Sequence, residues 1–136
     1  MLMGKLYKVN AIDLLPQEGE RTNGKKYSIY VSLESTHDIF KGHFPGNPIL
    51  PGVCQVEMVR EIASEILGSN LLLSEASHVK YINMINPLKD PVLRLNLELT
   101  ALGQDESGVS AEVFSAECIF MKMKGRLKGH NCTDDV

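Results

Sequence analysis

The chain has 136 residues, of which 43% are hydrophobic, and a formal net charge of −3 at pH 7. This length fits one domain, which can bury roughly two-thirds of its unfolded surface. The charge argues against nucleic acid as the main partner, because phosphate binding needs a clustered positive surface. No stretch approaches the ~20 apolar residues of a membrane span and no signal peptide is visible, so we expect a cytoplasmic protein. Three cysteines without CxxC spacing predict neither a disulfide framework nor a zinc site.

The first elements in chain order form a predicted β-hairpin. Residues 6–15 mix apolar and polar side chains and end at Pro16. The Asn23-Gly24 pair that follows is typical of a tight turn. From Tyr27 to Leu33 apolar and polar residues alternate, which is the period of a half-buried strand.

A helix is predicted next, after a stiff loop. Residues 42–53 contain three prolines and three glycines, a composition that ordinary helix or strand does not tolerate. Beyond them apolar residues recur at helical spacing as far as Leu67, and Gly68 supplies a stop signal. The helix is therefore expected to begin between Pro51 and Val53.

The remainder of the chain reads as strands. Residues 74–85 and 93–99 predict two strands, the second with strict alternation of leucine and polar residues. Residues 109–127 keep one strand phase, which as a single strand would span about 60 Å, so a break is expected at 115–117. The tail from Gly129 is polar and expected to fray. Strands, one helix, then strands indicate an α+β domain (residues 1–136) with a helix packed on an antiparallel sheet.

Two side chains of this region suit acid–base chemistry. His43 lies in the stiff loop, and Glu57 follows fourteen positions later, early in the predicted helix. The free N–H groups at the helix start, around Gly52, would point back at the loop and could stabilise a developing oxyanion. A base, an acid and oxyanion donors could therefore converge here.

The same stretch resembles a known family. Gly42-His43-Phe44-Pro45-Gly46-x-Pro48-Ile49-x-Pro51-Gly52-Val53-x-x-x-Glu57 is similar to the signature of the 3-hydroxyacyl-acyl carrier protein dehydratases, which have the hotdog fold, a long helix wrapped by an antiparallel sheet. The resemblance implies that His43 is the catalytic base, that Glu57 is its acidic partner, and that the Gly52 N–H polarises the thioester carbonyl. It also implies a site-shaping loop made by Phe44, Pro45, Gly46, Pro51 and Val53.

The resemblance further implies the reaction and its partners. A 3-hydroxyacyl group would arrive as a thioester on the phosphopantetheine arm of acyl carrier protein and leave as a trans-2-enoyl thioester, in fatty-acid or polyene-type chain synthesis. Glu57, protonated or through an ordered water, would give a proton to the departing hydroxyl. No metal or redox cofactor is expected. A homodimer or higher homo-oligomer is implied, with His43 of one chain facing Glu57 of the other and burial raising the pKa of Glu57.

Several alternatives remain open on the residues alone. Periodicity places Glu57 on one helix face with Arg60, Glu61, Ser64 and Glu65, which also fits a solvated polar stripe. Arg60 would favour the carboxylate form of Glu57 and Glu61 would disfavour it, so the protonation state stays open.

Other functions fit part of the pattern. A hotdog thioesterase and a non-catalytic acyl-binding partner subunit are the rival functions. The basic residues of 122–128 suit either a solvated strand face or the docking of an acidic carrier protein. Three further histidines are expected to be structural or on the surface: His37, His78 and His130. The leucines of 71–73 and 93–99 suit the core better than the wall of an acyl tunnel.

Overall fold

The computed structural model describes residues 1–16, 24–42, 46–116 and 118–129. Within these ranges the chain forms six strands and two helices. In chain order they are β1 (Tyr7–Leu14), β2 (Gly24–Leu33), α1 (Ile39–Gly42), α2 (Gly52–Leu67), β3 (Leu71–Tyr81), β4 (Val92–Gly103), β5 (Glu106–Phe114) and β6 (Ile119–Gly129). No helix in this part of the chain is long and apolar enough to cross a membrane.

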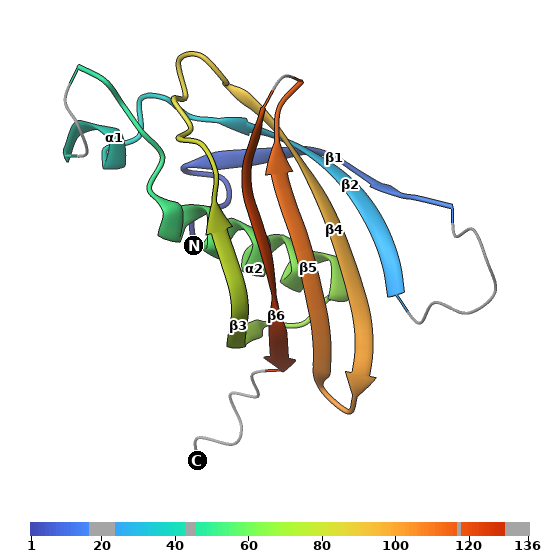
Figure 1. Cartoon of the computed structure of the whole chain (residues 1–136). Helices are drawn as coiled ribbons and strands as arrows, with labels where there is room; N and C mark the ends of the chain where they lie inside the picture. Colours follow the sequence, from blue (N-terminus) through green and yellow to red (C-terminus); the bar gives the residue numbers. More distant parts are fainter. Residues whose placement is uncertain (17–23, 43–45, 117, 130–136) are drawn as a thin grey trace.

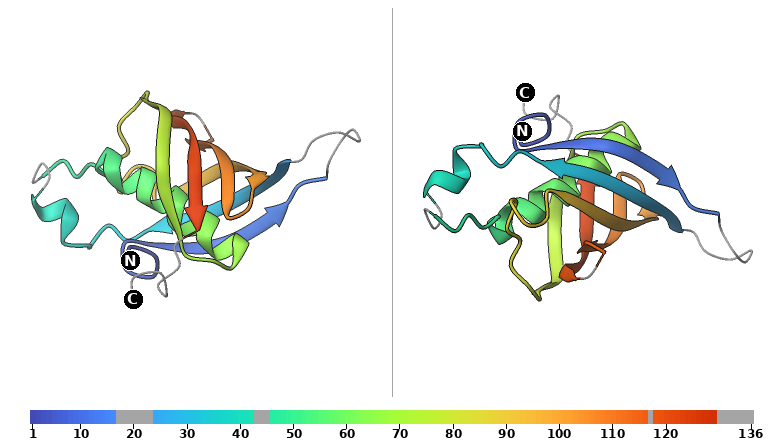
Figure 2. Two further views of the ribbon diagram at one scale, coloured as in Figure 1. Left: turned by 90° about the horizontal axis from the view of Figure 1, so that it is seen from below. Right: turned by 90° about the horizontal axis from the view of Figure 1, so that it is seen from above.

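The strands make one antiparallel sheet in the order β1-β2-β4-β5-β6-β3. The sheet curves around α2, which lies against one of its faces (Figures 1 and 2). β1 and β3 are the two edge strands. This is the α+β arrangement expected from the sequence.

The core lies between α2 and the inner face of the sheet. The alternating leucines of β4 all point inward and are at most 5% exposed, as the period-two pattern predicts. Full burial of one such side chain contributes about 1.5–3 kcal/mol to folding. Opposite them, α2 buries its apolar stripe, which consists of Cys54, Met58, Val59, Ile62 and Ala63.

Most predicted elements are confirmed. β1 and β2 pair as the N-terminal hairpin, but Gly24 is the first residue of β2 rather than part of a tight turn, and Asn23 lies outside the described residues. α2 ends where expected, because Gly68 adopts a left-handed conformation (φ 68°) that a residue without Cβ enters readily. β5 and β6 are separate strands: the Ser115 N–H donates to the Cys118 carbonyl at 2.8 Å and turns the chain between them.

Three expectations need correction. α1 was not predicted, and it includes Gly42, which had been assigned to the loop. β3 begins at Leu71 and ends at Tyr81 rather than spanning 74–85, since the chain then bends inward and buries Ile85 completely. Gly129 is not frayed, because it ends β6 and donates its N–H to the Asp105 carbonyl at 2.7 Å. Residues 130–136 lie outside the described part of the chain.

Candidate active site

The start of α2 is fixed by the segment that leads into it. Leu50 is 2% exposed, and its N–H donates to the Ile85 carbonyl at 2.8 Å. Pro51 follows as the N-cap with φ −60° and ψ 144°, which supplies no side-chain cap. Among the described residues, the N–H groups of Gly52 and Val53 have no acceptor. The helix therefore begins with free donors at the positive end of its dipole.

Gly52 lies beneath the ring of Tyr81. A Cβ built on Gly52 would lie 2.6 Å from Cζ and 3.0 Å from the hydroxyl oxygen of Tyr81, closer than real side chains approach. The Tyr81 side chain comes from the end of the edge strand β3, and burial raises the pKa of its hydroxyl. Only glycine at position 52 allows this close contact of a phenol with the helix start, and the sequence alone gave no sign of it.

Glu57 lies one turn into α2 and is paired with Arg60. The Arg60 Nε lies 2.6 Å from one carboxyl oxygen of Glu57, and Nη2 lies 3.0 Å from the other. This hydrogen-bonded pair is the main reason that the pKa of Glu57 is lowered; burial acts in the opposite direction. The expected rise in the pKa of Glu57 is therefore not seen in the described chain.

Glu61 departs from the predicted polar stripe, because it is fully buried. Its carboxyl oxygens accept hydrogen bonds from the N–H groups of Leu2 and Met3, both at 2.8 Å, and from the Tyr7 hydroxyl at 2.9 Å. A solvated stripe is thus wrong for this turn of the helix. Glu61 instead fastens the N-terminal segment to α2.

The structure brings only part of the predicted site together. Pro51, Gly52, Val53 and Glu57 all lie in or next to the first two turns of α2. Val53 is 75% exposed, and Gly46 is exposed with a φ of 87° that glycine tolerates. His43, Phe44 and Pro45 lie outside the described residues, so their predicted roles stay predictions.

The other predicted features are placed as follows. The His37 Nδ1 accepts a hydrogen bond from the Ile39 N–H at 3.1 Å and so supports α1, which fits a structural role. His78 is exposed on β3. Leu71 is buried, whereas Leu72 is 47% exposed, so the expectation of a core position fails for Leu72. Among the described residues, no three His, Cys, Asp or Glu side chains gather as metal ligands would.

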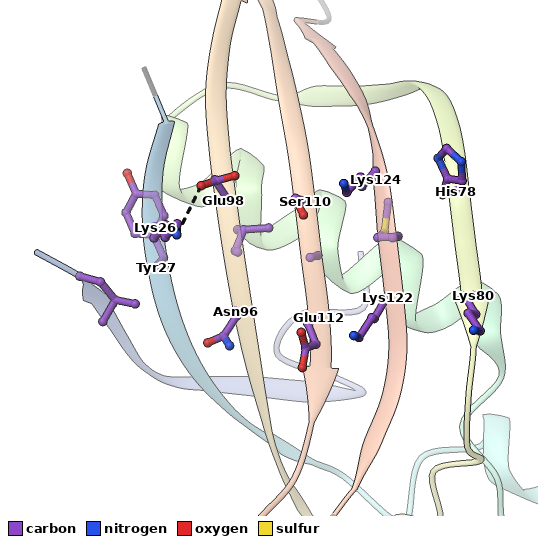
Figure 3. A pocket seen from close by; sticks show the side chains of 14 residues that line it. Lys26, Tyr27, His78, Lys80, Asn96, Glu98, Ser110, Glu112, Lys122 and Lys124 are labelled. Atoms are coloured by element: carbon purple, nitrogen blue, oxygen red, sulfur yellow. Dashed lines mark ion pairs between the residues drawn. The ribbon is translucent and has the colours of Figure 1, made fainter. Parts of the chain in front are cut away.

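A hollow of about 640 Å³ lies elsewhere, on the outer face of the sheet (Figure 3). None of the motif residues that the structure describes lines it. Figure 3 shows Lys80 of β3 beside Lys122 of β6, and His78 beside Lys124; both pairs are directly opposite in register. Lys80 and Lys122 place like charges opposite each other, which destabilises a sheet, whereas Glu112 of β5 lies opposite Lys122 on its other side.

The comparison with known families decides the relationship. A family model described as ApeI-like, ApeI dehydratase, matches residues 19–117. The chain belongs to the ApeI-like dehydratase family.

Individual relatives agree with membership of this family. The chain is 28% identical over 112 residues to the 3-hydroxyacyl-[acyl-carrier-protein] dehydratase FabZ of Clostridium acetobutylicum, covering 72% of this chain and 78% of that protein. It is 37% identical over 67 residues, 48% of this chain, to the bifunctional enzyme LpxC/FabZ of Porphyromonas gingivalis, but spans only 14% of that protein's length. For the FabZ of Alkaliphilus metalliredigens the identity is 33%, over 58% of this chain and 57% of the relative.

Solved structures establish the hotdog fold. An uncharacterized protein from Erwinia carotovora subsp. atroseptica superposes with a TM-score of 0.64 at 21% identity, covering 94% of this chain and 98% of that one. A chain of the dehydratase heterocomplex ApeI:P from Xenorhabdus doucetiae superposes with a TM-score of 0.61 at 22% identity, covering 89% of this chain and 96% of that one. A point mutant of the fluoroacetyl-CoA-specific thioesterase FlK superposes with a TM-score of 0.64 at 10% identity, covering 88% of this chain and 94% of that one. The ApeI-like chain therefore has the fold expected from its motif.

Proposed function

We propose that the protein dehydrates a 3-hydroxyacyl thioester, carried on acyl carrier protein, to the trans-2-enoyl thioester in fatty-acid or polyene-type chain synthesis. The observation that supports this proposal most strongly is the arrangement of backbone N–H groups and Glu57 at the start of α2, in a chain of the ApeI-like dehydratase family. The N–H groups of Gly52 and Val53, which have no acceptor among the described residues, precede Glu57 by about one turn. The loop of the motif, with His43, leads directly into them.

The chemistry follows from these groups. The thioester carbonyl accepts a hydrogen bond from the Gly52 N–H, which stabilises enolate-like charge and acidifies the adjacent C–H. His43, as neutral imidazole, removes that proton. Glu57 is the acidic residue that assists His43 as the hydroxyl leaves. Water leaves, and the double bond forms without a metal or redox cofactor.

Acyl carrier protein is the proposed partner that delivers the substrate. The relatives named above are acyl-carrier-protein dehydratases by name, which supports a carrier-bound substrate. Lys80, Lys122 and Lys124 form a basic row without an ion pair to any described residue. Lys80 directly precedes Tyr81, whose ring covers Gly52, so an acidic carrier bound at Lys80 would lie on the outer face of the edge strand whose last residue contacts the proposed site.

A homodimer with shared sites is part of the proposal. β3 is an edge strand of eleven residues, long enough to invite pairing with a second sheet. Apolar side chains stand exposed beside it and at the helix start, where a second chain could cover them: Val53, Leu72, Val79, Ile82 and Met84.

One observation favours a second candidate function. A hotdog thioesterase would use a carboxylate to activate water against the same carbonyl, and Glu57 is held in the form that this role needs. The two functions differ in their products, an enoyl thioester against a free acid.

Two variants test the proposed dehydration by enoyl-thioester absorbance. His43→Ala is expected to slow turnover by at least ~10², the low end of a general acid–base contribution. Glu57→Gln is expected to fold and to be strongly impaired, whereas Glu65→Gln on the exposed end of the same helix serves as the matched control. Near wild-type turnover in a folded His43→Ala protein would refute the assignment.

A further inference from the structure

The contact between Arg60 and Glu57 has the geometry of a fork. Two different nitrogens of the guanidinium reach two different oxygens of the carboxyl group, at 2.6 and 3.0 Å. The Arg60 side chain is only 19% exposed, and Glu57 is 38% exposed. Bidentate contacts of this kind fix orientation as well as charge, which a lysine cannot do.

The fork is itself anchored outside the helix. The third guanidinium nitrogen, Nη1, donates to the Leu71 carbonyl at 2.7 Å and approaches the Asn70 side-chain oxygen at 3.5 Å. Leu71 is the first residue of β3, and it is buried. Arg60 therefore connects the orientation of Glu57 to the start of the edge strand.

The groups around Glu57 leave Arg60 as its dominant charge partner. On α2 its neighbours are Arg60, Glu61 and the thiol of Cys54, whose pKa burial raises. From β1 comes Tyr7, whose pKa is also raised, chiefly by burial, so that it stays neutral. The N-terminal amine of Met1 adds a weaker positive contribution that lowers the pKa of Glu57 in the same direction as Arg60. β3 contributes the Leu71 carbonyl to this environment.

We propose that Arg60 is a positioning residue for the dehydration, which holds Glu57 as a carboxylate in one orientation throughout the catalytic cycle. This inference rests on the proposed function and deepens it. Glu57 then acts as an anion that accepts a hydrogen bond and stabilises the positive charge that develops on His43.

The proton balance of the reaction follows from this assignment. The Cα–H bond breaks as His43 takes the proton, and its electron pair forms the new double bond as the Cβ–O bond breaks. His43 returns the same proton to the departing hydroxide, which leaves as water. His43 ends neutral and Glu57 stays ionised, so no further reactant is needed.

The test compares pH profiles of kcat/KM for wild type, Arg60→Lys and Arg60→Met. Removing the cation raises the pKa of Glu57, so protonation of Glu57 adds to that of His43 in the acidic limb of the Arg60→Met profile, which becomes steeper and moves to higher pH. Arg60→Lys keeps the charge without the fork and should lie in between. In a Glu57→Gln background, Arg60→Met should change the rate by less than about 2-fold. Arg126→Met, which removes an arginine with ion pairs on the outer sheet face, is the matched control and should not move the profile.

A second readout does not depend on turnover. The ¹³C shift of the Glu57 carboxyl, assigned with the Glu57→Gln variant, gives its titration midpoint directly. We expect Arg60→Met to raise this midpoint and Arg60→Lys to raise it by a smaller amount. If Arg60→Met does not fold, the Arg60→Lys variant alone provides the test. An unchanged midpoint in Arg60→Met overturns the role of Arg60. So does activity of Arg60→Met that persists to higher pH than in wild type, because that result would mean that the active form of Glu57 is protonated. A folded wild type that dehydrates no 3-hydroxyacyl thioester overturns the proposed function itself, whatever the midpoint.

Discussion

Glu57 and Glu61 lie one helical turn apart on α2, yet their carboxyl groups face opposite surroundings. Glu57 is 38% exposed and held by Arg60, whereas Glu61 is fully buried and accepts three hydrogen bonds from the N-terminal segment. Glu57 is therefore partly accessible from solvent, whereas Glu61 is committed to the fold. The two should therefore respond differently to substitution.

Glu61→Ala should reduce stability strongly. It would leave two backbone N–H groups and the Tyr7 hydroxyl without their acceptor. An unsatisfied buried group costs about 1–3 kcal/mol, and the two N–H groups are only partly buried, so we expect the free energy of unfolding to fall by ~2 kcal/mol or more. Chemical denaturation measures this, with the exposed Glu65→Ala as control, which should stay within about 0.5 kcal/mol of wild type. A loss below ~1 kcal/mol for Glu61→Ala would show that the cluster does not hold the N-terminal segment.

The sequence predicted the helix and most strands because those signals are local. The period of the leucines in β4 and the stop at Gly68 each lie within one element. Glu61 was misassigned to a solvated stripe because its partners lie 54 to 59 positions away in the chain, where helical periodicity carries no information. Two further features were missed for a similar reason: the hydrogen bond that His37 accepts from the Ile39 N–H in the four-residue α1, and the inward bend before Ile85. Neither produces a repeating pattern.

The candidate site was predictable only in part. The motif marked Gly52 and Glu57, and the helix starts where the prolines indicated. The contact of Tyr81 with Gly52 joins two elements that are far apart in the chain and could not be derived from spacing. The protonation of Glu57 depended on whether Arg60 points toward it, which is a matter of rotamer.

Gly52→Ala should displace the Tyr81 ring rather than the helix. The new Cβ would overlap the ring, but Tyr81 is 50% exposed and can swing into solvent. We expect a stability change below about 1 kcal/mol together with reduced turnover, because the ring next to the N–H that is proposed to bind the carbonyl has moved. The Gly52→Ala/Tyr81→Ala pair, compared with both single variants, isolates the coupling between the two positions. Strict additivity of the two effects on kcat would show that Tyr81 plays no part at the helix start.

Reversing the charge of the basic row should raise KM for substrates bound to acyl carrier protein but not for substrates on pantetheine alone. Lys122→Glu with Lys124→Glu removes two cations that have no ion pair among the described residues. We expect KM for a carrier-bound substrate to rise at least several-fold, and more at low salt, because charge pairs steer association. KM for the same acyl group on pantetheine alone should stay unchanged and serves as the control. An equal loss with both substrates would place the effect in the fold rather than in docking.

Shared active sites predict recovery of activity when two inactive variants are mixed. After subunit exchange between His43→Ala and Glu57→Gln, about half of the dimers are mixed, and each has one site with both lesions and one with neither. Up to about a quarter of wild-type activity should return. A monomer that is fully active at micromolar concentration, or no recovery after exchange has been demonstrated by mass, would contradict a shared site.

The most direct test of the central claim is the product formed from a 3-hydroxyacyl group loaded on acyl carrier protein, identified by intact-protein mass spectrometry. Dehydration predicts that the acyl chain stays on the carrier and loses the mass of one water, and that His43→Ala abolishes this change. Release of the free acid with recovery of the unloaded carrier would indicate a thioesterase. An unchanged carrier that nonetheless binds the wild-type protein would indicate a non-catalytic partner subunit, and either result would contradict the proposed function.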